Sequence, residues 1–214
     1  MSTIAIVDYG MGNFFSVARA LQAASPAASI LIARDPQDIL QAERVVLPGQ
    51  GAMPDCMRHL RHSGLLPAVL HAAQHKPLLG ICVGEQMLFD SSQEGPSACL
   101  GLLAGTVRRF ETGKNSKIDQ GKPLIKVPHV GWNRVHQCKP HALWHNINDG
   151  AYFYFVHSYF AQPTHDADIA AYSYYGQGFT SAVARANIFA VQYHPEKSAD
   201  NGLQFFRNFS NWKP

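Results

Sequence analysis

Residues 77–89 read Pro-Leu-Leu-Gly-Ile-Cys-Val-Gly-Glu-Gln-Met-Leu-Phe: a short apolar run, a cysteine between two glycines, and a helix-like stretch. This Gly-x-Cys-x-Gly pattern predicts a nucleophile elbow, a sharp strand-to-helix turn that lifts the side chain of Cys82 above a sheet. Bulky side chains would clash in so tight a turn, which explains the glycines at Gly80 and Gly84. The amides and dipole of the following helix would favour a nucleophilic thiolate. The segment therefore nominates Cys82 as a nucleophile, although a buried, inert core cysteine fits the segment alone equally well.

Short apolar runs alternate with helical patterns throughout the first half of the chain. Such alternation is typical of parallel strands joined by crossover helices, with helices covering both faces of the sheet. We expect strands at residues 4–7, 29–33, 45–47 and 78–81, and helices at residues 14–24, 52–60 and 65–74.

Aromatic and β-branched runs dominate from residue 106 to residue 191, and they indicate antiparallel or mixed strands added to the same sheet. The clearest runs are 152–156, 169–174, 181–184 and 188–191. A closing helix is expected at 201–212, and the polar stretch 111–122 is expected to be a mobile surface loop. The predicted fold is a single three-layer α/β domain over residues 1–214, with a central mixed, largely parallel sheet flanked by helices.

The composition is that of an ordinary globular protein, with 46% hydrophobic and 15% charged residues among 214. The formal net charge is only +3, and scattered Lys and Arg give no support to nucleic-acid or membrane binding. No apolar run is long enough to span a membrane, and the first one, residues 4–7, is too short for a signal peptide. Cys56, Cys82, Cys99 and Cys138 lack the paired spacing of disulfide frameworks or zinc sites. These features predict a cytoplasmic protein with reduced thiols and no bound metal.

A Pro-Gly-Gln-Gly turn at residues 48–51 follows the third expected strand. Backbone N–H groups in such a turn can point outward, as an oxyanion hole requires. A plain tight turn explains the same residues.

A third feature, Val-Gln-Tyr-His-Pro-Glu-Lys-Ser, occupies residues 191–198. In an extended backbone His194 and Glu196 point the same way, so both can face one site. A carboxylate bonded to one imidazole nitrogen fixes the tautomer and leaves the other nitrogen free to take a thiol proton. Taken alone, a His-x-Glu pair is usually incidental surface chemistry.

The segment Asp-Tyr-Gly-Met-Gly-Asn at residues 8–13 stands where a dinucleotide-binding fingerprint would lie, between a strand and a helix. The third glycine of that fingerprint would fall at position 15, which is Phe15. Without it the helix cannot approach the strand closely, so a nicotinamide site is not expected.

Cys82, the 48–51 turn and the His194-Pro-Glu196 segment together resemble the class I glutamine amidotransferases, because each supplies one part of an acyl-transfer mechanism. Within that family, residues 6–13, 127–133, 154–159 and 194–198 look like the glutaminase subunits of imidazole glycerol phosphate synthases. The resemblance covers nearly the whole chain, and its most specific part is the Pro-His-Val-Gly-Trp-Asn segment. Gln50 and Glu85 depart from it, since they occupy positions where these proteins commonly have apolar residues.

The resemblance implies a Cys82-His194-Glu196 triad that hydrolyses glutamine without a cofactor. The Cys82 thiolate would attack the side-chain amide, His194 would manage the protons, and Glu196 would orient it. The backbone amides of Gln50 and Val83 would form the oxyanion hole. The residues implied in glutamine binding are Gly49, Gly51, Gln86, Glu94, His157, Ser158 and Tyr159. Glu94 suits the α-ammonium group of the substrate, with an exposed glutamate at a helix end as the alternative.

The chain contains nothing that resembles an acceptor site for the ammonia, which would become ammonium in neutral water. The resemblance implies a (β/α)8-barrel cyclase partner that makes imidazole glycerol phosphate and aminoimidazole carboxamide ribotide in histidine biosynthesis. Residues implied at the docking face or ammonia passage are Asn13, Trp132, Tyr154 and Lys197. Alone, the chain is expected to hydrolyse glutamine slowly.

Three other interpretations remain open from the sequence. A paralogous amidotransferase could feed a different synthase, although the segments 8–13 and 128–133 favour histidine biosynthesis. A non-catalytic protein could have kept the fold, but the intact triad argues against it. A free-standing cysteine hydrolase acting on peptides is disfavoured by the pocket motifs, which match glutamine.

Overall fold

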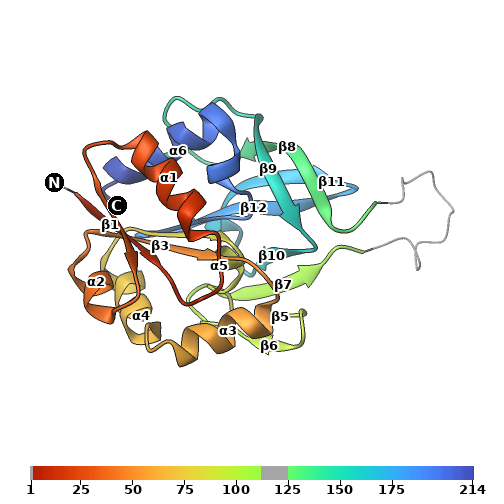
Figure 1. The fold of residues 1–214 in the computed structure, drawn as a ribbon. Helices are drawn as coiled ribbons and strands as arrows, with labels where there is room; N and C mark the ends of the chain where they lie inside the picture. Colours follow the sequence, from red (N-terminus) through yellow and green to blue (C-terminus); the bar gives the residue numbers. More distant parts are fainter. Residues whose placement is uncertain (1, 112–124) are drawn as a thin grey trace, which may run out of the picture.

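A nine-stranded mixed sheet runs through the centre of the computed structural model, which describes residues 2–111 and 125–214 (Figure 1). The strand order is β2-β1-β3-β4-β13-β12-β11-β8-β9. The parallel part comprises β1 (Thr3–Val7), β2 (Ser29–Ala33), β3 (Arg44–Gly49), β4 (Leu78–Cys82) and β13 (Ile188–Val191). Antiparallel pairing continues through β12 (Gln177–Arg185), β11 (Ile169–Tyr175), β8 (His129–Gln137) and β9 (Ala151–His157). The predicted mixed α/β sheet is confirmed, with an antiparallel part as wide as the parallel one.

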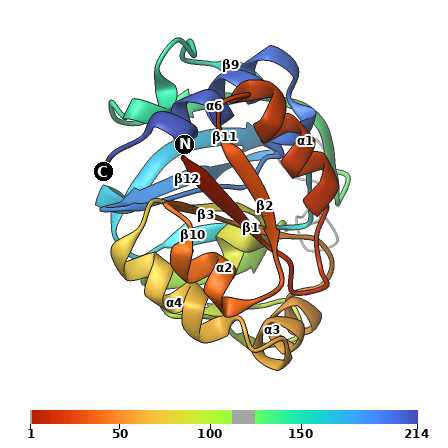
Figure 2. The ribbon, with the colours of Figure 1, turned by 60° about the vertical axis from the view of Figure 1, so that its left-hand side comes forward.

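Helices cover both faces of this sheet and complete three layers (Figure 2). Helices α1 (Phe14–Ala24) and α6 (Ala199–Asn211) lie on one face. Helices α2 (Pro36–Gln41), α3 (Met53–His62) and α4 (Leu66–His75) lie on the other. The strands β3, β4 and β13 are buried along their whole length, as expected for apolar strands covered on both sides.

Helix α2, with six residues, is an element of the parallel part that we did not predict. Its start has a recognisable signal, because Asp35 caps the helix by accepting a hydrogen bond from the Gln37 amide at 2.8 Å. Pro36 then occupies the first turn, where its missing N–H costs nothing. The helix is too short for its apolar periodicity to stand out.

Strands β7 (Gly105–Arg109) and β10 (Tyr159–Pro163) correct the expectation that all later strands join one sheet. They form a separate four-stranded sheet, together with β5 (Ser91–Ser92) and β6 (Ser97–Ala98). Gly105 permits the close pairing of β7 with β10, since a Cβ atom there would lie 2.5 Å from the Gln162 carbonyl oxygen. Periodicity reveals a strand but not its partner. The predicted loop at 111–122 lies, from residue 112, outside the described residues.

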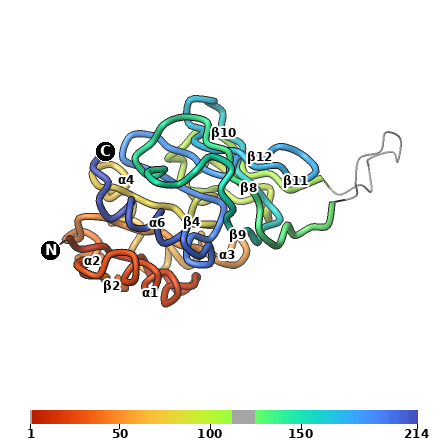
Figure 3. Tube along the Cα trace, turned by 90° about the horizontal axis from the view of Figure 1, so that it is seen from above, coloured from red at the N-terminus to blue at the C-terminus, as the bar shows by residue number. Residues whose placement is uncertain are grey.

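The two chain ends lie at the same side of the molecule (Figure 3). The buried Arg44 at the start of β3 joins them. Its guanidinium donates to the Ser2 hydroxyl at 2.7 Å, and to the carbonyl oxygens of Phe209 and Trp212 at 3.2 and 3.0 Å. This residue therefore ties the end of α6 to the start of β3, an interior strand of the sheet.

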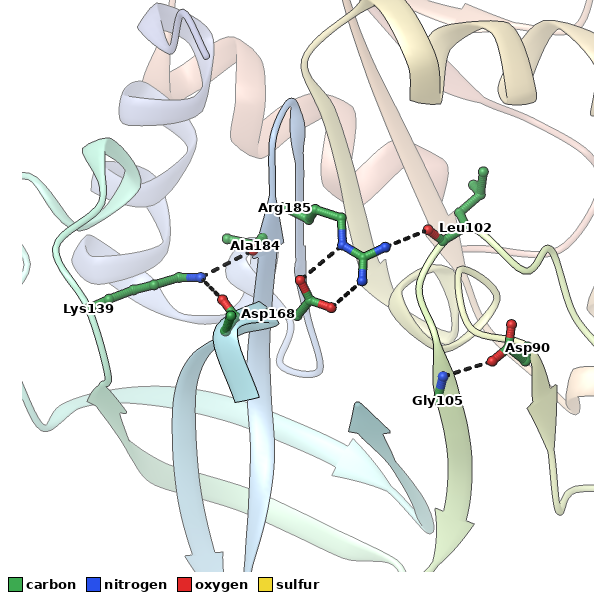
Figure 4. Close-up of polar contacts among 8 residues, drawn as sticks. Asp90, Leu102, Gly105, Lys139, Asp168, Ala184 and Arg185 are labelled. Atoms are coloured by element: carbon green, nitrogen blue, oxygen red, sulfur yellow. Dashed lines mark hydrogen bonds and ion pairs between the residues drawn. The ribbon is translucent and has the colours of Figure 1, made fainter. Parts of the chain in front are cut away.

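A second polar cluster holds the small sheet against the large one (Figure 4). Arg185, at the end of β12, donates to both carboxylate oxygens of Asp168 and to the Leu102 carbonyl oxygen, the latter at 3.4 Å. The Asp90 carboxylate accepts from the Gly105 amide at 2.8 Å. Strand register places Arg185 opposite Ile188, at the end of the sheet away from Cys82.

Replacing Arg185 by methionine should lower the free energy of unfolding without harming chemistry at Cys82. The change leaves the buried Asp168 carboxylate unpaired, at a cost of about 1–2 kcal/mol, reduced because the Arg185 side chain is 39% exposed. Urea unfolding measures the loss of unfolding free energy, and Arg207→Met, at an exposed arginine, is the matched control. Equal stability of the two variants would contradict the structural role of the cluster.

Candidate active site

The turn after β4 has the geometry expected of a nucleophile elbow. Strand β4 ends at Cys82, and α5 (Val83–Gln86) begins at the next residue. Cys82 has φ 56° and ψ −113°, a combination that non-glycine residues rarely adopt. A Cβ atom at Gly84 would lie 1.9 Å from the Leu47 carbonyl oxygen, and one at Gly80 would lie 2.9 Å from the Cβ of Ala190. As predicted, neither position has room for a side chain, which explains both glycines. Helix α5 ends at Gln86, whereas the sequence indicated a helical stretch that continues to residue 89.

His194 and Glu196 form a buried ion pair just beyond β13. The imidazole Nδ1 donates to Glu196 Oε1 at 2.8 Å, and the two side chains are 7% and 1% exposed. The pairing arises in a short 3-10 turn, Pro195–Lys197, and not from the alternation of an extended backbone that the sequence suggested. Nε2 has no hydrogen-bond partner among residues 2–111 and 125–214, so it remains available for proton transfer.

The charges around His194 favour its protonated form. Burial alone would lower the pKa of the imidazole. A negative charge on Cys82 and the hydrogen bond to Glu196 outweigh burial and raise the pKa to about 10. The charge on Cys82 therefore acts on His194, and the arrangement stabilises the imidazolium form of His194.

A cavity of about 260 Å³ lies beside Cys82 and His194. Its wall contains Pro128 and Val156, which we did not predict, and most of the residues that we did. The predicted wall residues are Asn13, Gln50, Gly51, Cys82, Val83, Gln86, Glu94, His157, Ser158, Tyr159, His194 and Lys197. The wall does not include the other predicted residues, which are Gly49, Glu196, Trp132 and Tyr154.

The 48–51 turn packs directly against the elbow. A Cβ atom at Gly49 would lie 2.7 Å from the Gly84 amide nitrogen and 2.9 Å from the Cβ of Val83. The Gln50 carbonyl oxygen accepts from the Cys56 thiol at 3.6 Å, which fixes that peptide toward α3. Gly51 adopts φ +112°, a conformation that glycine allows without strain. The turn thus borders the cavity on the same side as Val83.

Gln192 contacts Cys82 and was missed by sequence reasoning. Its Nε2 donates to Cys82 Sγ at 3.9 Å, and its Oε1 accepts from Gln86 Nε2 at 2.8 Å. The same Gln86 nitrogen donates to the Tyr159 carbonyl oxygen at 3.0 Å. A glutamine that extends a strand of otherwise buried residues is unusual, and this is the signal that could have identified it.

Glu94 borders the cavity while capping a helix. Its Oε2 accepts a hydrogen bond from the Met53 amide at the start of α3, at 2.8 Å. A carboxylate at this position is favoured by the helix dipole. Glu94 lies in the turn between β5 and β6, half-buried and facing the cavity, so it is not the exposed glutamate at a helix end that was considered as the alternative.

An apolar patch, which we call the outer β8–β9 face, is formed by Val130, Trp132, Tyr154 and Val156. Trp132 and Tyr154 pair across the two strands with ring centroids 6.0 Å apart, and Lys197 Nζ lies 5.8 Å from the Tyr154 ring centroid. Val130 and Trp132 are 55% and 52% exposed. Because Val156 and Lys197 also belong to the cavity wall, the face is continuous with the cavity.

Neither a metal-binding cluster nor a membrane-spanning helix is found in the described parts of the chain. Across 2–111 and 125–214, no three His, Cys, Asp or Glu side chains are grouped so that they could hold a metal ion. The helices found there are all too short or too polar to cross a lipid bilayer.

Glu85, on α5, is fully buried directly beside the elbow. Within the described residues neither of its carboxylate oxygens has a hydrogen-bond partner. Burial, reinforced by the charge of Cys82, holds the pKa of this carboxyl well above its ordinary value of 4.5. The protonated form is therefore the one that the fold accommodates.

Replacing Glu85 by methionine should remove a pH-dependent loss of stability. Above pH 4.5 the glutamate ionises in the unfolded chain before it does in the folded one. The wild type should therefore lose about 1.4 kcal/mol of unfolding free energy per pH unit from this group until the folded-state pKa is reached.

Urea unfolding between pH 5 and pH 7 measures this difference. The Glu85→Met variant should gain about 1–3 kcal/mol over the wild type as the pH rises across that range. The exposed Glu43→Met serves as the control. Parallel stability curves for wild type and Glu85→Met would contradict the account of Glu85.

Comparison with known proteins identifies the relatives of the chain. A family model described as "Glutamine amidotransferase class-I" matches residues 5–211. The chain is 56% identical over 212 residues to imidazole glycerol phosphate synthase subunit HisH of Dechloromonas aromatica (strain RCB), covering 99% of this chain and 97% of that protein. It is also 56% identical over 214 residues to the subunit HisH of Nitrosospira multiformis, across the full length of both.

Solved structures share the fold at much lower identity. One is PurLQS from Thermotoga maritima, with a TM-score of 0.69 and 18% identity over 98% of both chains. Another is described as a glutamine amidotransferase, with a TM-score of 0.69 and 16% identity, covering 98% of this chain and 99% of that one. At such identities the likeness concerns the fold alone.

Proposed function

Because the chain belongs to the class I glutamine amidotransferases, we propose that it hydrolyses glutamine to glutamate and ammonia as the glutaminase subunit of an imidazole glycerol phosphate synthase. The observation that carries the proposal is the placement of Cys82 and His194 at one cavity, with Glu196 buried behind the imidazole. The relatives named as HisH subunits support the choice of synthase, since they match over essentially the whole chain.

The reaction begins with attack by the Cys82 thiolate on the side-chain amide carbon of glutamine. A carbon–sulfur bond forms, and the carbonyl electron pair moves onto oxygen. The backbone amides of Gln50 and Val83 would donate to this oxyanion, because both residues line the cavity beside the sulfur.

His194 then gives its Nε2 proton to the nitrogen of the tetrahedral intermediate. The carbon–nitrogen bond breaks, ammonia leaves, and a γ-glutamyl thioester remains on Cys82. The Glu196 carboxylate accepts a hydrogen bond from Nδ1–H at 2.8 Å, which keeps that proton on Nδ1 and leaves Nε2 as the nitrogen that exchanges protons. In the second half, Nε2 takes a proton from water as the water oxygen attacks the thioester, and the carbon–sulfur bond breaks to release glutamate.

The cavity volume of about 260 Å³ suits a single amino acid, which fits glutamine and not a peptide. Glu94 supplies a carboxylate for the α-ammonium group. The remaining groups proposed to bind substrate are Gly49, Gly51, Gln86, His157, Ser158 and Tyr159. Gly49 acts indirectly, by allowing the 48–51 turn to lie against the elbow.

The ammonia needs a partner, since in neutral water it becomes ammonium and loses its nucleophilicity. We assign the partner as a (β/α)8-barrel cyclase subunit that docks on the outer β8–β9 face. Asn13 and Lys197 line the cavity, and Lys197 also lies over Tyr154, so these residues mark the side on which ammonia would leave. The four cysteines are unpaired, which fits the proposed cytoplasmic location.

Glutamate release should depend on both the partner and Cys82. Adding the cyclase subunit and its ribonucleotide ligand should raise the slow rate of the isolated chain, because docking organises the cavity. Cys82→Ala should lower the stimulated rate at least about 1,000-fold, since the nucleophile is lost. The exposed Cys138→Ala is the matched control. Fast turnover without partner, or activity that survives in Cys82→Ala, would refute the proposal.

Binding of the cyclase subunit should depend on Trp132. Trp132→Ala removes an exposed aromatic anchor, which should raise the Kd for the cyclase at least about 30-fold. The control is Tyr172→Ala on β11, an aromatic residue that is 49% exposed and lies outside the outer β8–β9 face. Isothermal titration calorimetry decides the matter, and an unchanged Kd for Trp132→Ala would place the docking surface elsewhere.

A further inference from the structure

Polar side chains, two of them buried histidines, connect the inner side of β8 to the wall of the cavity. Asn133 Nδ2 lies 3.4 Å from His129 Nε2, and His129 Nδ1 lies 2.9 Å from His157 Nε2. His157 Nδ1 in turn lies 2.8 Å from the Tyr159 carbonyl oxygen. His157 and Tyr159 line the cavity, whereas His129 does not, so His129 acts from behind the wall.

The Tyr159 carbonyl oxygen connects these hydrogen-bonded side chains to Cys82. It also accepts from Gln86 Nε2, whose second hydrogen goes to Gln192 Oε1. Gln192 Nε2 then donates to the Cys82 sulfur. A continuous hydrogen-bonded chain therefore runs from β8 to Cys82 through one backbone carbonyl.

The Tyr159 carbonyl oxygen, where the series of histidine hydrogen bonds ends, fixes the direction of each of those bonds. A carbonyl oxygen can only accept, so His157 Nδ1 carries a proton and its neutral ring accepts at Nε2. His129 must then carry its proton on Nδ1, which leaves its Nε2 to accept from the Asn133 amide. Asn133 is fixed in turn, because its Oδ1 accepts from the Arg134 amide at 2.8 Å.

Both imidazoles are neutral around pH 7, as this direction requires. Burial lowers the pKa of His129 to about 4. Burial, with the nearby charges of His129 and His194, lowers that of His157 to about 3 despite the bond to Tyr159. Neither ring therefore donates from both nitrogens.

Aromatic packing holds the His129 ring in one orientation. The ring is stacked on Tyr175 with centroids 4.1 Å apart and on Phe155 with centroids 5.1 Å apart. His129 is only 3% exposed. Packing therefore holds the plane of the ring, and the Asn133 contact at Nε2 leaves Nδ1–H directed at His157 before any substrate binds.

We propose that His129 is a positioning residue for glutamine binding, which donates to His157 and thereby holds the cavity wall at His157 and Tyr159. The inference rests on the proposed function, because the wall it positions is the proposed glutamine pocket. Val130 and Trp132, which alternate with His129 along β8, belong to the outer β8–β9 face. A partner that binds there touches the strand whose inner side positions the pocket.

Steady-state kinetics with the cyclase subunit present test the proposal through two substitutions. His129→Phe keeps an aromatic ring but removes the donor, so the KM for glutamine should rise about 5- to 10-fold for one lost hydrogen bond, with kcat within about 3-fold. His129→Asn places an amide N–H near the position of Nδ1, so its KM should return to within about 3-fold of wild type. His136 lies on the same strand but takes no part in this series of hydrogen bonds, so His136→Phe should leave KM unchanged.

Thermal unfolding establishes that each variant is folded before its KM is interpreted. An unchanged KM in folded His129→Phe would overturn the proposal. The proposal would also be overturned if the KM of His129→Asn were as high as that of His129→Phe. Ring packing, and not the Nδ1–H donor, would then determine KM.

A second measurement is independent of activity. Long-range 1H–15N correlation spectra of the wild type should show both His129 and His157 as neutral Nδ1–H tautomers. An Nε2–H tautomer at either ring would contradict the proposed direction of the histidine hydrogen bonds and overturn the proposal. Absence of glutamine hydrolysis in the wild-type complex would refute the proposed function, while the spectra would still decide the positioning chain.

Discussion

The site depends on the close approach of the elbow to strand β3. The Gly84 position lies so near the Leu47 carbonyl oxygen that a single added carbon would overlap it at 1.9 Å. This contact holds α5 against β3 and brings the Gly49 and Gly51 turn beside the residue that follows Cys82. The left-handed backbone at Cys82 is the local cost of the arrangement, and the fully buried strands on either side maintain it.

Electrostatics then determines what the elbow can do. A buried carboxylate beside His194 would be unfavourable if it were unpaired, and the 2.8 Å hydrogen bond offsets that burial. The resulting imidazolium stands next to the Cys82 sulfur, and a negative charge on that sulfur raises the pKa of His194. Glu85 shows the contrary case, because a carboxyl buried without a partner is held in its neutral form.

Strong periodicity allowed most of the fold to be predicted. The strands of the parallel part and helix α1 follow the expected ranges, and the family assigned from motifs is confirmed by the match over residues 5–211. The separate sheet of β7 and β10 could not be predicted, because strand patterns do not specify pairing partners. Gln192 and His129 were missed for a related reason, since a buried polar side chain acquires its role only from partners distant in sequence.

The central claim is that Cys82 carries the γ-glutamyl group during turnover. Acid quenching of the complex while it hydrolyses glutamine, followed by peptide mass spectrometry, tests that claim directly. The account predicts a γ-glutamyl adduct on the peptide that contains Cys82 and none on the peptides that contain Cys56, Cys99 or Cys138. Glutamate release with an adduct on a different residue, or an adduct that persists in Cys82→Ala, would contradict it.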